Sequence, residues 1–149
     1  MRHFVLFSRK GWTSSEFDPK NLKEYGRLDL VVRCLASAFA LSRKIRDNVK
    51  FHLILYGPPN PPKYIEFSPK AFRGILFDEI SLGNLLKRAL SGIKIEGITV
   101  RKSSFQEVIR KLSLNEIYIL HEKGIPIEEV EFGTNVVFVL GDHIGLPKK

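Results

Sequence analysis

Cysteine is almost absent from this chain, and no hydrophobic run is long enough to cross a membrane. The one cysteine, Cys34, excludes an internal disulfide and any zinc site built from several cysteines. A membrane helix needs roughly 18 apolar residues in a row. The apolar stretch at residues 4–7 is also too short for a secretory signal, and no cleavage site follows it. We therefore expect a soluble, cytoplasmic protein.

Acidic residues are scarce relative to basic ones. The 149 residues include 24 Lys and Arg but 16 Asp and Glu, which gives a net charge of +8. Such an excess favours a polyanionic partner, most often a nucleic acid. A thermophile's charged surface is the alternative, although it explains the number of charges better than their imbalance. The length suits one domain, and we expect residues 1–149 to form it.

Several short apolar runs lack the alternation of a strand with one exposed face. A strand that is apolar on both sides is covered on both sides, which is typical of a parallel sheet. We expect such strands at residues 4–7, 53–56, 117–120 and 136–140. Weaker strand patterns occur at residues 64–67, expected as an edge hairpin after the prolines, and at 98–101.

Helical patterns lie between these strands. Leu28, Val31, Val32, Leu35 and Phe39 follow the spacing of one buried helix face, which predicts a helix over residues 27–42. We expect a second helix capped by Ser81 and ending at Gly92, and a third that begins with the capping box of Ser104 and Glu107. A short helical segment is expected before the last strand. Strands that alternate with helices predict an α/β fold, a mostly parallel sheet with helices on both faces.

Ligands of parallel sheets bind at the carboxyl ends of the strands. The last two strands are followed by residues 121–124 and by the turn Gly-Asp-His-Ile-Gly at 141–145, which is either a small-molecule pocket or simply a tight turn. His121 and His143 could form a zinc pair, but no third ligand has suitable spacing, so we expect no metal. The Gly-rich nucleotide loops and the serine-hydrolase elbow are absent from the sequence.

The first third of the chain combines cations with aromatic residues. Arg9, Lys10, Arg27 and Arg33 are among its basic residues, and the aromatic residues between them are Trp12, Phe17 and Tyr25. This combination suits phosphates and unstacked bases, and the alternative is a solvated basic face with aromatic core residues. Asp29 stands four residues before Arg33, which indicates either a surface ion pair or a carboxylate held beside a substrate base.

Three strings in this order carry a resemblance: Gly-Arg-Leu-Asp-Leu at residues 26–30, Tyr-Gly-Pro-Pro-Asn-Pro-Pro at 56–62, and Gly-Asp-His-Ile-Gly at 141–145. With these strings the sequence resembles the archaeal tRNA pseudouridine N1-methyltransferases, which belong to the SPOUT class of knotted methyltransferases. The resemblance runs from Met1 to Gly145. It implies a homodimer that uses S-adenosylmethionine to methylate N1 of pseudouridine-54 in the T loop of tRNA, within the T arm.

The resemblance also implies roles for individual residues. Cofactor binding would fall to the strand-end residues Leu120, Gly141, Asp142 and Ile144. Asp29 would be the catalytic residue, which orients N1–H of the base or accepts its proton. Arg27 and Arg33 would hold the RNA backbone or the Asp29 carboxylate, and Arg9 and Lys10 would add RNA contacts. A reactive methyl donor then requires mainly positioning and one proton acceptor.

Members of the family continue beyond the last turn with a segment that completes the knot. The present chain ends at Lys149, so we expect the knot-completing segment to be missing and exposed apolar strand faces to promote association. Two alternatives remain: a related SPOUT enzyme that acts on a pseudouridine of ribosomal RNA, or a truncated, non-catalytic RNA-binding domain.

Overall fold

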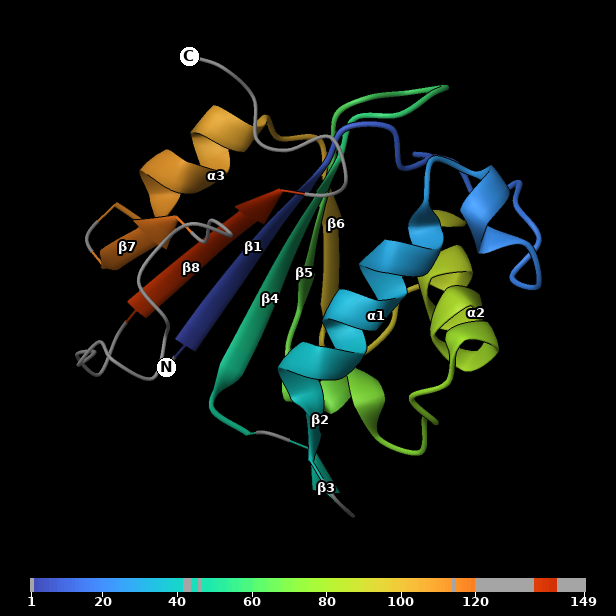
Figure 1. Cartoon of the computed structure of the whole chain (residues 1–149), viewed down its shortest axis with the longest axis horizontal. Coiled ribbons are helices and arrows are strands. Elements are labelled where there is room, and N and C mark those ends of the chain that lie inside the picture. Colours follow the sequence, from blue (N-terminus) through green and yellow to red (C-terminus); the bar gives the residue numbers. More distant parts are fainter. Residues whose placement is uncertain (1, 42–43, 46, 114, 120–135, 142–149) are drawn as a thin grey trace.

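The computed structural model of the chain contains a six-stranded sheet and describes residues 2–41, 44–45, 47–113, 115–119 and 136–141. The strands lie in the order β6-β5-β4-β1-β8-β7. Their bounds are β1 Arg2–Ser8, β4 Val49–Leu55, β5 Lys63–Phe67, β6 Ile98–Arg101, β7 Glu116–Ile119 and β8 Val136–Gly141. The predicted α/β fold is confirmed at this level (Figure 1).

The four strands β4, β1, β8 and β7 run parallel to one another, whereas β5 runs antiparallel to both β4 and β6. In the register, Ser8 lies beside Leu55, and Phe7 lies beside Gly141. The carboxyl ends of β1, β4 and β8 therefore meet at one edge of the sheet. In an open parallel sheet this is the edge where ligands bind.

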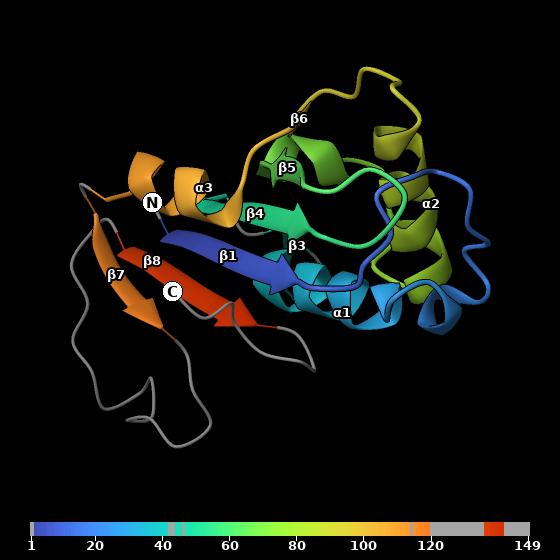
Figure 2. The ribbon, with the colours of Figure 1, turned by 90° about the horizontal axis from the view of Figure 1, so that it is seen from above.

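The helices lie on both faces, as predicted. Two of them, α1 Leu28–Phe39 and α2 Glu79–Leu90, cover one face, and α3 Phe105–Lys111 covers the other (Figures 1 and 2). Leu28, Val31, Val32, Leu35 and Phe39 are all at most 1% exposed, so the stripe read from the sequence is the buried face of α1. Short 3₁₀ turns at Leu22–Glu24 and Pro69–Phe72 complete this side.

The face under α3 holds a smaller core. Val108 and Leu112 pack there with Val5, Ile54 and Val137. The predicted capping box is present: the Glu107 amide donates to Ser104 Oγ at 3.1 Å, and the Ser104 amide donates to the Glu107 carboxylate at 3.1 Å. Apolar contacts on both faces explain why β1, β4 and β8 read as continuous hydrophobic runs.

Three local expectations need correction, and a fourth is not tested. Asp78, not Ser81, caps α2, because its carboxylate accepts from the Ser81 amide at 3.1 Å. Helix α1 ends at Phe39, where the chain becomes extended and pairs β2 Ala40–Leu41 with β3 Lys44–Ile45. The strand β5 is not at the edge, since β6 pairs with it. The short helical segment expected before the last strand lies outside the described residues.

Across the described part of the chain, no helix has the length and apolar character needed to span a membrane.

Candidate functional site

Three connections meet at the carboxyl edge of the sheet: residues 9–27 after β1, residues 56–62 after β4, and the end of β8. The amide of Thr13 donates to the Pro58 carbonyl at 2.9 Å, and its hydroxyl donates to the Gly57 carbonyl at 3.1 Å. That hydroxyl also accepts from the Asn60 amide at 2.7 Å. Thr13 is 2% exposed, so one buried threonine joins the basic segment to the proline-rich segment.

Glycines allow these segments to approach each other closely. A Cβ on Gly57 would lie 2.2 Å from the Lys10 carbonyl oxygen, and one on Gly26 would lie 1.7 Å from the same atom. Gly26 also has φ +69°, a left-handed conformation that side chains disfavour. Glycine at positions 26 and 57 therefore has a structural reason: both positions pack against the backbone of Lys10.

Asp29 lies in the first turn of α1 and is clamped by Arg27. The guanidinium donates from Nε to Oδ1 at 2.9 Å and from Nη2 to Oδ2 at 3.0 Å. Asp29 is 3% exposed, so the expectation of a surface ion pair is wrong. Arg33, four residues on, is the more distant partner, with Nη2 at 3.9 Å from Oδ2. The hydrogen bonds from Arg27 hold the pKa of Asp29 below its usual value, so the buried carboxylate stays ionised at neutral pH.

Arg27 has an unusual backbone. Its φ of 60° and ψ of 45° place it in the left-handed region, and it is the residue that directly precedes α1. A bulky residue at positive φ is disfavoured. The two hydrogen bonds to Asp29 offset that cost, and the left-handed backbone turns the guanidinium onto the buried carboxylate.

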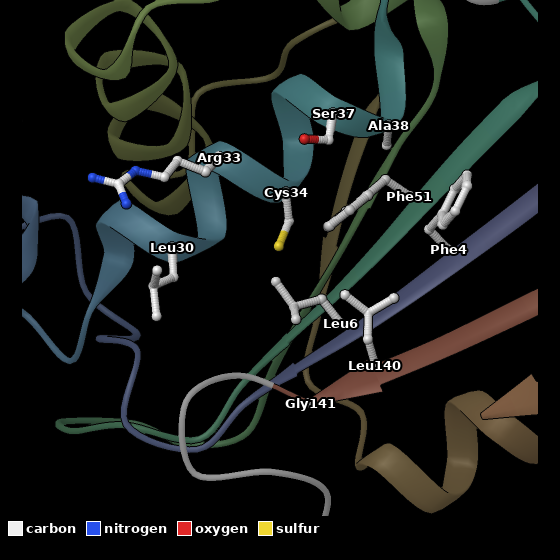
Figure 3. A pocket seen from close by; sticks show the side chains of 10 residues that line it. All are labelled: Phe4, Leu6, Leu30, Arg33, Cys34, Ser37, Ala38, Phe51, Leu140 and Gly141. Carbon is white, nitrogen blue, oxygen red and sulfur yellow. The ribbon is translucent and has the colours of Figure 1, made fainter. Parts of the chain in front are cut away.

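An open cavity of about 410 Å³ lies between α1 and the sheet (Figure 3). Leu30, Arg33, Cys34, Ser37 and Ala38 line it from α1, and Phe4, Leu6, Phe51, Leu140 and Gly141 line it from the strands. In Figure 3 the Cys34 side chain points from α1 toward the strands, whereas the Arg33 guanidinium extends away from the centre. The walls are mostly apolar, and the volume lies within the range of small-molecule sites.

Of the four residues expected to bind a cofactor, Gly141 is described and lines this cavity. Leu120, Asp142 and Ile144 lie outside the described residues, as do His121 and His143. Among the residues that the structure describes, no group of three or more metal-ligating side chains gathers.

The expected RNA-binding residues are not equivalent. Lys10 and Arg33 are exposed, whereas Arg9 is half-buried, with its guanidinium 5.7 Å from the centre of the Phe7 ring. Arg27 is engaged with Asp29 but keeps 32% of its side chain exposed.

Of the interleaved aromatic residues, Phe17 belongs to the core at 3% exposure, which agrees for this residue with the alternative of aromatic core residues. Trp12 and Tyr25 are half-buried and pack edge to face, with ring centres 4.8 Å apart. Two of the three aromatic side chains therefore remain accessible near the cations.

His3 and His52 form a polar cluster on the sheet. His3 Nδ1 lies 2.9 Å from His52 Nε2, and His52 Nδ1 lies 2.6 Å from the Tyr64 hydroxyl. That hydroxyl donates to Glu66 at 3.3 Å. Burial lowers the pKa of His52 to about 3, so the ring is neutral in the folded protein at neutral pH.

Two parts of this edge were not found from the sequence. The first is a second face of α1 that lines the cavity and consists of Leu30, Arg33, Cys34 and Ser37. These residues recur at helical spacing, so the sequence contained a signal for this face. A second cavity of about 240 Å³ is lined by Trp12, Ser14, Glu16, Pro58 and Pro59. No local pattern could have predicted it, because its walls come from two distant segments.

The comparisons with known proteins agree on one family. The model of a family described as "Putative SAM-dependent RNA methyltransferase" matches residues 1–149. A tRNA (pseudouridine(54)-N(1))-methyltransferase of Thermococcus onnurineus is 42% identical in an alignment of 161 positions, gaps included. The alignment covers 98% of this chain and 79% of that protein. Enzymes of the same name are 41% identical in Thermococcus kodakarensis, covering 100% and 82%, and 38% identical in Methanocaldococcus jannaschii, covering 98% and 78%.

Proposed function

The chain belongs to this family of SAM-dependent RNA methyltransferases, and we propose that it methylates N1 of pseudouridine-54 in the T arm of archaeal tRNA. The proposal takes its substrate from relatives that cover nearly the whole chain. Those relatives also favour tRNA over ribosomal RNA, the alternative considered from the sequence.

The observation that carries the proposal is the buried Asp29 carboxylate next to the open cavity between α1 and the sheet, which reaches the carboxyl end of β8 at Gly141. The next residue, Leu30, lines that cavity together with Gly141, and Arg33 connects the two because it both lines the cavity and approaches Asp29 at 3.9 Å. An ionised carboxylate, two guanidiniums and an apolar recess therefore lie at one place, where a base and a methyl donor could meet.

Asp29 suits the task of orienting N1–H. Arg27 occupies one acceptor position on each carboxylate oxygen, and each oxygen can accept a further hydrogen bond. The lowered pKa makes the carboxylate a weak base but a permanent acceptor. We infer that Asp29 accepts a hydrogen bond from N1–H, which orients the base so that the electron pair of N1 faces the methyl group. As the N1–methyl bond forms and the sulfur–methyl bond of the donor breaks, the proton of N1 passes to the carboxylate and from there to solvent.

Lys10, Arg33 and Arg9, with the exposed part of Arg27, would contact the RNA phosphates. Their charges lie at the same edge as Asp29, and phosphate contacts of this kind fix the register of an RNA without reading its sequence. Each residue would act as a positioning residue, since none is expected to touch the reacting atoms.

The residues at the end of β8 fit S-adenosylmethionine in two respects. Gly141 presents backbone without a side chain at the rim of the cavity, and the apolar walls of Leu6 and Leu140 suit an adenine ring. When bound there, the cofactor supplies an electrophilic methyl group. Leu120, Asp142 and Ile144 are proposed to complete the site on the strength of the resemblance.

We further propose a SPOUT-type knotted fold, a homodimer and a cytoplasmic location, which follow from the family and from a tRNA substrate. The parallel order β4-β1-β8 supports the first of these.

The test is methyl transfer to a T-arm hairpin that carries pseudouridine. The unmodified protein should transfer methyl groups to this RNA and not to the uridine version, because N1 of uridine is the glycosidic nitrogen. Asp29→Asn should lower the rate at saturating RNA by about 100-fold. Asp47→Asn is the matched control, since Asp47 is an exposed carboxylate that precedes β4 at the opposite edge of the sheet.

A full rate in Asp29→Asn would remove Asp29 from the mechanism. Calorimetry with S-adenosylmethionine separates the enzyme from the alternative of a non-catalytic RNA-binding domain. Binding of the cofactor by the folded protein supports the enzyme, and its absence supports the alternative.

A further inference from the structure

We propose that the second cavity, between Trp12 and the Pro58–Pro59 pair, is a stacking site for an unpaired base of the RNA substrate, distinct from the base that is methylated. The proposal rests on the proposed function for its RNA. Its ligand class is a nucleobase extruded from a single-stranded loop.

The walls of the cavity carry the flat rings that stacking requires. Its volume is about 240 Å³, and its walls are an indole, two proline rings and two small polar groups at Ser14 and Glu16. Tyr25 supports Trp12 edge to face, and the Trp12 amide donates to the Tyr25 carbonyl at 3.4 Å. Since stacked bases prefer rigid flat surfaces, a supported indole offers binding free energy at low entropic cost.

The opposite wall is equally fixed. Pro58 and Pro59 are both exposed, yet the Pro58 carbonyl accepts from the buried Thr13 amide, and Asn60 is bonded to the Thr13 hydroxyl. The hydrogen bonds of Thr13 therefore hold Trp12 and the prolines at a constant separation. The site exists before any ligand arrives, which favours tight binding of a flat group.

Charge complementarity identifies the occupant as a nucleic acid rather than an apolar peptide. Lys10 is exposed, and its backbone packs against Gly57, the residue before the proline pair. Lys102 is exposed and donates from Nζ to Asn60 Oδ1 at 3.1 Å. Exposed lysines thus lie on two segments next to the cavity, so phosphates on either side of a stacked base would find partners there.

The rim predicts which bases enter. Glu16 is exposed at the rim, and an ionised carboxylate can only accept hydrogen bonds. A base with an exocyclic amino group, such as cytosine or adenine, donates to it from a group that projects beyond the ring. Uracil has N3–H as its only donor on that edge, between the acceptors O4 and O2, both of which the carboxylate repels. The site should therefore prefer cytosine over uracil.

Trp12 is the sole tryptophan of the chain, so its fluorescence reports this site directly. The T-arm hairpin should quench the emission of the unmodified protein, and anisotropy of the labelled hairpin gives the affinity independently. Trp12→Ala should weaken binding about tenfold, and Trp12→Phe should restore most of the loss. Leu76→Ala is the control, because Leu76 is a 72% exposed apolar residue outside both cavities.

The base preference has its own test. A cytidine oligonucleotide should quench Trp12 more strongly than a uridine oligonucleotide of equal length, and Glu16→Gln should reduce the difference. Equal quenching by the two oligonucleotides would overturn the role of Glu16.

Each outcome separates this proposal from the proposed function. Binding of the hairpin without quenching, together with unchanged affinity in Trp12→Ala, would overturn the stacking site and leave methylation standing. Quenching by the hairpin without methyl transfer would support the stacking site and count against the proposed function. Failure of the folded protein to bind the hairpin would overturn both.

Discussion

Arg27 adopts a left-handed backbone conformation and donates two hydrogen bonds, of 2.9 and 3.0 Å, to the buried carboxylate of Asp29. Arg27 thus has a disfavoured φ and is also the main charge partner of Asp29, the candidate catalytic residue. If Arg27 is removed, the Asp29 carboxylate remains buried away from water without its counter-charge, which destabilises the folded protein.

The first prediction separates these two features. Arg27→Gly removes the backbone strain at positive φ and also removes the two hydrogen bonds to Asp29, called the clamp below. If the clamp dominates, the melting temperature should fall by about 5 °C despite the relief. Adding Asp29→Asn should recover part of the loss, because the unpaired charge is gone. A melting temperature that rises in Arg27→Gly would mean that the clamp contributes little to stability.

The second prediction concerns the close approach at Gly26. Gly26→Ala and Gly74→Ala both place a side chain at nearly the same φ, +69° and +72°. A Cβ at Gly74 would meet nothing within 4 Å, whereas one at Gly26 would collide with the Lys10 carbonyl. Gly74→Ala should therefore cost about 1 kcal/mol of unfolding free energy and Gly26→Ala about 3 kcal/mol or more.

Urea denaturation measures both variants of this second prediction. Equal losses would show that the positive φ alone matters and that the segment of Lys10 can move away from Gly26.

The third prediction is a loss of stability in mild acid. Burial lowers the pKa of His52 to about 3, and its value in the unfolded chain is near 6.5. Between these pH values the unfolded state binds more protons, so stability is fully present above about pH 6.5 and declines toward about pH 3. The loss is up to about 1.4 kcal/mol for each pH unit.

Unfolding midpoints across this window test the third prediction. His52→Gln, which cannot titrate, should reduce the slope of the profile, and the slope that remains in this window belongs to His3, whose pKa burial also lowers. The neighbouring Glu66 also has a lowered pKa, but its usual range lies lower, so its loss begins in stronger acid. A profile that stays equally steep in His52→Gln would assign the effect to another group.

The fourth prediction concerns salt. If RNA affinity comes mainly from phosphate contacts, it should fall steeply as the salt concentration rises. Lys10→Gln should reduce the slope of log affinity against log salt by about one. Lys70→Gln is the control, because Lys70 is exposed beside Glu96 in a turn that follows β5. A flat salt response of the unmodified protein would contradict RNA contact through the basic residues.

The elements could be read from the sequence because each depends on local periodicity. The apolar run at residues 136–140 became β8, and the box of Ser104 and Glu107 became the start of α3. The predicted ends of two helices were wrong, because in each case a residue outside the apolar pattern decided where the helix begins or ends. The carboxylate of Asp78 accepts from the Ser81 amide, so α2 begins at Glu79 and Ser81 lies inside the helix. The chain after Phe39 is extended because it pairs with Lys44–Ile45.

The candidate site also has a part that the sequence predicted and a part that depends on the tertiary structure. The sequence by itself determined the family, through three short strings, and the identity of Asp29, Arg27 and Gly141 as candidates. The tertiary structure decided that Asp29 is buried under Arg27, that His3 meets His52 across 49 positions, and that Trp12 faces two prolines. Periodicity along the chain records which side of an element is apolar. It does not record which distant segments share a turn, because that depends on the hydrogen bonds and close backbone contacts formed only when the sheet assembles.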